Sequence, residues 1–183
     1  MKYFPLVALA LAAGISAPAF AQDGETAPKS FEPYVGVLGG IHDFDNEQYN
    51  GSPPSGFNGR IVEGVAGVNY NLGSKFIIGA EGSVAKGISG DIDWEYGAAG
   101  RIGFRAGKDS MFFAKAGYQW TNFDALGNNS RDYDGTIYGV GAELSLADMG
   151  SSADRSNIRF RAQVDTRGDF HSFRPMAGIV AKF

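Results

Sequence analysis

The stretch "DWEYGAAGRIGFR", residues 93–105, alternates between two kinds of side chain with a period of two. One set is mostly apolar or aromatic and consists of Trp94, Tyr96, Ala98, Gly100, Ile102 and Phe104. The other set is small or charged and consists of Glu95, Gly97, Ala99, Arg101, Gly103 and Arg105. Because successive side chains of a strand point to opposite faces, this stretch is predicted to be a strand with one apolar and one polar face.

The same alternation recurs along the chain and predicts eight strands, most of them longer than the roughly 5–6 residues of an ordinary strand. Their ranges are Pro33–His42, Arg60–Leu72, Lys75–Lys86, Asp93–Arg105, Met111–Trp120, Gly135–Ala147, Ser156–Thr166 and Arg174–Phe183. A tilted strand of about 9–11 residues crosses a bilayer, and short turns that alternate with longer loops are typical of an up-and-down barrel. The sequence therefore predicts an all-β fold, an eight-stranded antiparallel up-and-down transmembrane β-barrel.

Alternation alone does not decide which face of the barrel is the outer one. The polar face is mostly Gly, Ala and Ser, and such small residues suit the crowded interior of an eight-stranded barrel. Large aromatic side chains of the apolar face gather at both ends of the strands. Phe76, Phe104 and Phe112 lie at the short-turn ends, and Trp94, Tyr118 and Trp120 lie at the long-loop ends. Two aromatic girdles around an apolar band indicate a membrane with two interfaces.

The charged residues of the polar face are then expected inside the barrel. They are Glu63, Glu81, Glu95, Arg101, Arg105, Lys115, Glu143, Arg159, Arg161, Asp165 and Lys182. Buried charges are tolerated when they are paired and hydrogen-bonded, and acids and bases are nearly balanced in this set. We expect a charge network that plugs the lumen. A narrow ion path through the same residues is the alternative.

The N-terminal segment is predicted to be a signal peptide, residues 1–21, rather than part of the fold. Lys2 is followed by an apolar run over residues 6–15 and by the cleavage pattern Ala19-Phe20-Ala21. Residues 22–32 are polar and are expected to form a flexible leader. Residues 33–183 are assigned to the barrel.

Composition excludes several kinds of site. There is no Cys, which excludes disulfides and thiolate metal sites, and the net charge of −4 offers no basic patch for nucleic acid. The two histidines, His42 and His171, are expected at the rim, where they contact headgroups or water. His171 and Ser172 are adjacent on the chain and are therefore not expected to form a catalytic pair. We predict no enzyme activity, no cofactor and no metal.

One tripeptide in a predicted loop, Arg167-Gly168-Asp169, matches an adhesion sequence but is also an ordinary turn sequence. So short a match is a weak signal, and whether the tripeptide binds anything stays open.

The C-terminal stretch "MAGIVAKF", residues 176–183, is predicted to be the last strand and to close the barrel. Phe183, Ala181, Ile179 and Ala177 would face outward, and the residues between them inward. A closed barrel leaves no free edge, so this strand must pair with Tyr34–His42. The facing of that first strand stays open, because Val35, Val37 and Ile41 compete with Tyr34 and Leu38 for the outer face.

The first strand "YVGVLGG", the stretch "GAEGS" from Gly79 to Ser83, and the terminal "GIVAKF" resemble the small outer-membrane β-barrels of Gram-negative bacteria. These include the OmpA-type transmembrane domain, the OmpX and opacity-like proteins and the short "porin family" proteins. The resemblance implies an outer-membrane location, with outer-membrane lipids and lipopolysaccharide as neighbours. It also implies insertion by the outer-membrane assembly machinery, which recognises a terminal strand ending in Phe, here Phe183.

Three functions follow from these expectations. The leading one is a monomeric, non-enzymatic barrel with a structural or surface-interaction role in the envelope. In the surface-interaction role, its loops would bind a host or surface ligand. The alternatives are a narrow porin for small solutes or ions and a soluble secreted ligand-binding barrel.

Overall fold

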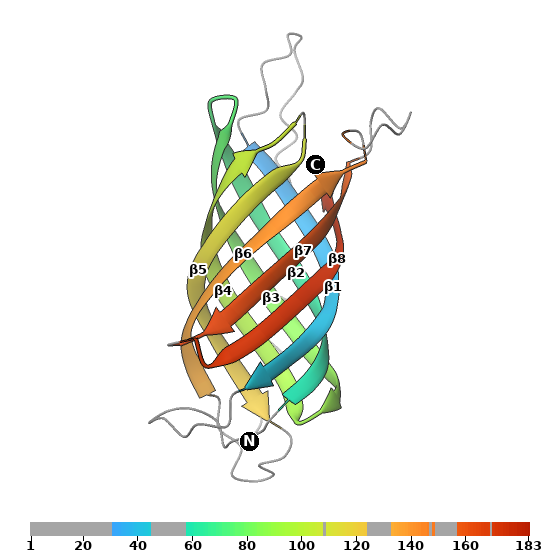
Figure 1. Cartoon of the computed structure of the whole chain (residues 1–183), viewed down its shortest axis with the longest axis vertical. Coiled ribbons are helices and arrows are strands. Elements are labelled where there is room, and N and C mark those ends of the chain that lie inside the picture. Colours follow the sequence, from blue (N-terminus) through green and yellow to red (C-terminus); the bar gives the residue numbers. More distant parts are fainter. Residues whose placement is uncertain are drawn as a thin grey trace.

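A computed structural model describes residues 31–44, 58–107, 109–123, 133–146, 148, 157–168 and 170–183 (Figure 1). The predicted signal peptide, residues 22–30 of the predicted leader and Asp169 lie outside these residues. The eight strands are β1 (Phe31–Phe44), β2 (Asn58–Leu72), β3 (Phe76–Gly90), β4 (Ile92–Arg105), β5 (Met111–Phe123), β6 (Tyr133–Ser145), β7 (Ile158–Arg167) and β8 (Ser172–Lys182). No helix among the described residues has the length and hydropathy that spanning a membrane requires.

Every strand pairs antiparallel with the next one along the chain, and β8 pairs with β1, so the sheet closes into a barrel. In Figure 1 the strands are tilted and wrap around one axis. At the closing seam Val37 pairs with Ile179, and the amide of Phe183 donates to the carbonyl of Pro33 at 2.9 Å. The predicted fold class is confirmed.

Most strand boundaries differ from the expected ones by one to four residues, and two of these differences reassign a segment. β1 begins at Phe31, so Phe31 and Glu32, predicted for the leader, belong to the barrel. Residues 87–92, predicted as a connection, mostly extend β3 and β4, because β3 continues to pair with β2 as far as Gly90. Gly90 then takes a φ of 95°, which lets the chain reverse at Asp91.

The two ends of the barrel differ in their connections. One end carries the short β2–β3 and β4–β5 connections, residues 73–75 and 106–110, and we call it the turn end. The opposite end carries the β3–β4 and β7–β8 reversals, and we call it the loop end. The C-terminus lies at the turn end, at the top of Figure 1.

The outer face of the barrel is apolar. Outward side chains such as Ile102, Val140 and Ile179 are 64%, 62% and 51% exposed. Between the ends, β2 to β5 carry mostly small outward residues. The facing of β1, left open by the sequence, is now assigned: Val35, Val37 and Ile41 point outward, whereas Tyr34 and Leu38 are buried inside.

The aromatic residues predicted for the girdles lie on this outer face. Phe76 pairs with Phe104, and Phe104 with Phe112, so the three rings lie side by side near the turn end. Toward the loop end Trp120 packs against Tyr118 and stacks on Tyr96, with ring centroids 5.0 and 5.4 Å apart. Trp94 lies on β4 two residues nearer the loop end than Tyr96.

An apolar cluster lies inside the barrel at the loop end. Phe44, Ile61, Ile92 and Phe123 are each no more than 5% exposed, and Tyr133 packs against them. Phe44 contacts Phe123, which in turn contacts Tyr133, with ring centroids 5.4 and 5.7 Å apart. We call these five residues the apolar lid.

Candidate functional site

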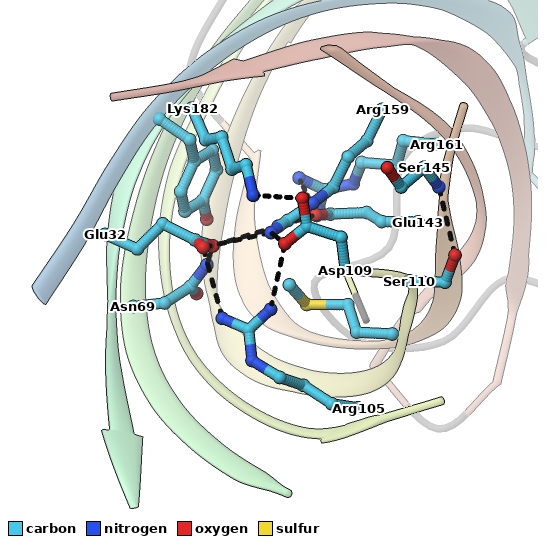
Figure 2. Close-up of polar contacts among 12 residues, drawn as sticks. Glu32, Asn69, Arg105, Asp109, Ser110, Glu143, Ser145, Arg159, Arg161 and Lys182 are labelled. Carbon is cyan, nitrogen blue, oxygen red and sulfur yellow. Dashed lines mark hydrogen bonds and ion pairs between the residues drawn. The ribbon is translucent and has the colours of Figure 1, made fainter. Parts of the chain in front are cut away.

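The interior of the barrel holds a network of ion pairs that begins at the turn end (Figure 2). Glu32 accepts two hydrogen bonds from Arg159, both at 2.9 Å, and one from Arg105 at 3.1 Å. Asp109, on the β4–β5 connection, reaches into the mouth of the barrel. It pairs with Arg159 at 3.3 Å and with Lys182 of β8. These ion pairs join the connection to β7 and to the last strand.

Glu81 of β3 is the centre of the network. Its two carboxylate oxygens accept from Arg161 at 2.5 and 2.9 Å, and the Tyr34 hydroxyl donates to it at 2.8 Å. Lys115 and Arg101 lie 3.5 and 3.4 Å from the same carboxylate. Three bases therefore share one buried acid.

Glu143 of β6 joins the centre to the turn end. Arg101 donates to one of its oxygens at 2.9 Å, and Arg159 donates to the other at 3.1 Å. The same Arg101 also lies over the rings of Tyr34 and Phe113, at 5.0 and 4.2 Å from their centroids. The aromatic residues of the interior thus stabilise guanidinium groups as well as fill space.

A second group of acids surrounds Arg174 of β8, nearer the loop end. Its guanidinium pairs with Glu95 at 3.1 Å, with Asp165 at 3.0 Å, and with Glu63. Lys115 lies 3.0 Å from Asp165 as well as close to Glu81, so it links this group to the centre. These side chains are at most 3% exposed.

His42 connects the network to the apolar lid. Its Nδ1 lies 2.5 Å from Glu95 Oε1, and its ring stacks on Phe44 with centroids 4.0 Å apart. The side chain is only 1% exposed. The expectation that His42 lies at the rim in contact with headgroups or water is therefore wrong, because the inward facing of β1 puts this ring in the interior.

All eleven charged residues predicted for the lumen lie inside the barrel, where each takes part in an ion pair. Four members of the network were missed, namely Glu32, His42, Asp109 and Arg174. The alternation of the last strand, counted back from Lys182 through Met176, would have placed Arg174 inside. Asp109 gave no such signal, because it lies in a turn.

Other candidate sites do not gather reactive groups. Ser172 Oγ accepts from the backbone amide of Arg167 at 2.9 Å and is buried. The side chain of Arg167 is inside the barrel and only 7% exposed, so it is not displayed on the surface with Gly168. In the described part of the chain, no three His, Asp or Glu side chains are arranged to hold a metal ion.

Comparisons with known proteins agree with this architecture. A family model described as the outer membrane protein beta-barrel domain matches residues 7–172. Among solved structures, Neisserial surface protein A is 14% identical, with a TM-score of 0.52 over 84% of this chain and 97% of the other. No curated protein matches the chain.

Two further solved structures have the same fold. The Yersinia pestis attachment invasion locus protein Ail, in complex with the heparin analogue sucrose octasulfate, is 14% identical, with a TM-score of 0.52 over 84% of this chain and 97% of Ail. The N-terminal barrel domain of Pseudomonas aeruginosa OprF is 11% identical, with a TM-score of 0.50 over 84% and 98%. At such identities these structures show the fold alone.

The family match and the apolar outer face exclude the third alternative, a soluble secreted barrel, because an outer-membrane barrel turns its apolar face to lipid. The chain belongs to the outer membrane protein β-barrel family, and its location is the outer membrane of Gram-negative bacteria.

Proposed function

We propose that the protein is a monomeric, non-enzymatic barrel with a closed lumen, which serves the envelope as a structural and surface-presenting element. The observation that carries the proposal is an unbroken chain of contacts between the turn end and the lid. It runs through Asp109, Arg159, Glu143, Arg101, Glu81, Lys115, Asp165, Arg174, Glu95 and His42.

Passage through this interior would require several of these contacts to break together. Removing the partner of a buried charge costs about 3–5 kcal/mol, so the paired arrangement resists opening. The apolar lid lies beyond the network at the loop end, and four of its five side chains offer an ion no polar ligand. Both features favour a plug over the alternative of a narrow porin.

We expect the purified barrel to show no large, steady conductance in planar bilayers. The measurement is single-channel current under applied voltage, with a porin inserted in the same bilayer set-up as the control. A stable open channel of porin size would contradict the closed lumen and favour the transport alternative.

A surface role rests on the loop end. Short turns of such barrels face the periplasm, so the loop end is assigned to the cell exterior. Ail, which shares the fold, is described in complex with a heparin analogue. This supports the proposal that the present barrel also holds its loops in place for a ligand outside the cell.

Phe183 is proposed as the assembly signal. Its side chain is 62% exposed on the outer face, and Phe112 is a matched control because it is 57% exposed near the same end. We expect Phe183→Gln to lower the amount of folded barrel in the envelope much more than Phe112→Gln does. Heat-modifiable migration of membrane fractions on gels measures folded barrel. Equal yields from the two variants would remove the terminal Phe from this role.

A further inference from the structure

Three Lys or Arg side chains in the described part of the chain do not point into the barrel, and two of these are neighbours. Lys75 lies in the β2–β3 turn. Arg60 of β2 and Lys86 of β3 are exposed on the outer face near the loop end. The remaining described bases point into the lumen, so among the described residues this pair carries the positive charge of the outer face near the loop end.

The pair lies at the level of a membrane interface. Lys86 is directly opposite Trp94 in the β3–β4 register, and its ammonium lies 4.7 Å from the centroid of that ring. Trp94 is 45% exposed on the outer face. Trp and Tyr gather at the headgroup level of membranes, so Lys86 is placed where lipid phosphates lie.

Arg60 and Lys86 are close enough to contact one group. Val62 pairs with Lys86 and Arg60 pairs with Ser89, so the two bases are diagonal neighbours on adjacent strands. A β-bulge between Arg60 and Ile61 adds one residue to this diagonal, which spans about 7 Å in a regular ladder, and the two long side chains can still converge. A hollow of about 320 Å³ beside Arg60 is lined by Asp43, Asn58 and Ser89, among others.

Hydrogen-bond donors of both bases are available. Arg60 forms no ion pair with any described residue, although Asp43 lines the same hollow. Lys86 pairs with Asp93, but its side chain is 46% exposed, and one carboxylate does not use all three ammonium donors. The surface below the pair, toward the middle of the membrane, is apolar and consists of Val62, Gly64 and Val84.

We infer that Arg60 and Lys86 bind a phosphate group of lipopolysaccharide in the outer leaflet, with its acyl chains lying on the apolar surface below. Charge-assisted hydrogen bonds to phosphate, made at an interface beside Trp94, supply the recognition. This inference rests on the proposed assignment of the loop end to the cell exterior, and it does not depend on whether the lumen conducts.

The test uses the folded full-length barrel in detergent and bisphosphorylated lipid A, with retained lipid counted by native mass spectrometry. We expect the double variant Arg60→Gln/Lys86→Gln to retain about tenfold less lipid A, which corresponds to the loss of about 1.4 kcal/mol of binding free energy. Lys75→Gln is the matched control, since it removes an outward base at the opposite end, and it should bind like the wild type.

A second arm needs no variant and therefore does not depend on folding of an altered chain. The wild type should retain dephosphorylated lipid A and phosphatidylglycerol less well than the bisphosphorylated form. Equal retention of the dephosphorylated lipid, equal retention of phosphatidylglycerol, or undiminished binding by a folded double variant would each overturn the site.

Discussion

Replacing Glu81 by Gln is expected to lower the free energy of unfolding of the barrel by about 3–5 kcal/mol. The substitution keeps the shape of the side chain and removes its charge. Arg161, Arg101 and Lys115 then share an interior with too few acids, and their side chains are at most 3% exposed, so water cannot compensate. The measurement is equilibrium unfolding in urea in lipid vesicles, followed by the fluorescence of Trp94 and Trp120.

Asp93→Asn provides the matched control for Glu81→Gln. It also removes one carboxylate from an ion pair, but the partners Lys86 and Asp93 are 46% and 23% exposed. Exposed pairs contribute about 0–1 kcal/mol, so this variant should unfold nearly like the wild type. A loss of unfolding free energy below about 1 kcal/mol for Glu81→Gln would mean that the network reorganises around a missing acid. It would contradict the claim that the three bases depend on the charge of Glu81.

Gly178→Ala is expected to cost about 3 kcal/mol or more, because its new methyl group would enter the backbone of β1. A Cβ at this position would meet the carbonyl oxygen of Val37 and would lie 2.7 Å from the Cα of Leu38. Backbone atoms in the closing seam cannot move aside as a flexible side chain can. Urea unfolding in the same vesicles gives the free energy, and the heat-modifiable band gives the folded fraction.

Gly39→Ala tests the same seam from the opposite face. Gly39 pairs with Ala177, next to Gly178, and a Cβ there has no atom within 4 Å. A stabilisation of about 0.4–1 kcal/mol is expected, because Ala restricts the unfolded chain. If the two variants had equal stability, crowding of the seam would not explain the glycine at position 178.

The sequence predicted the faces of most strands because a period of two is set by the backbone and not by the neighbours. Arg101, Arg159 and Arg161 were placed inside in this way. The method failed for β1, where Tyr34 and Leu38 are apolar and yet point inward. The inward position of Tyr34 is explained by contacts with other strands, because its ring stabilises Arg101 and its hydroxyl donates to Glu81.

The pairing of acids with bases could not be predicted from the sequence. Which carboxylate meets which guanidinium depends on the tilt and register of strands that are not paired with each other in the sheet. Glu32 meets Arg159 of β7, and Glu63 meets Arg174 of β8. Nothing in the local sequence of either residue specifies its partner. The alternation therefore predicted which residues belong to the network but not which of them form ion pairs with each other.

The distribution of charge along the chain has a consequence for how the barrel forms. The inward charges of β1, β2 and β3 are the carboxylates Glu32, Glu63 and Glu81, together with His42, whereas β7 and β8 supply most of the guanidinium groups. Glu63 pairs with Arg174, 111 residues away, whereas Glu32 pairs with Arg105 of β4 as well as with Arg159, 127 residues away. A half-formed sheet that lacks β8 would therefore carry the unpaired Glu63 carboxylate into hydrocarbon, which is costly. We therefore expect insertion of the first strands into lipid to be coupled to closure of the ring by β8.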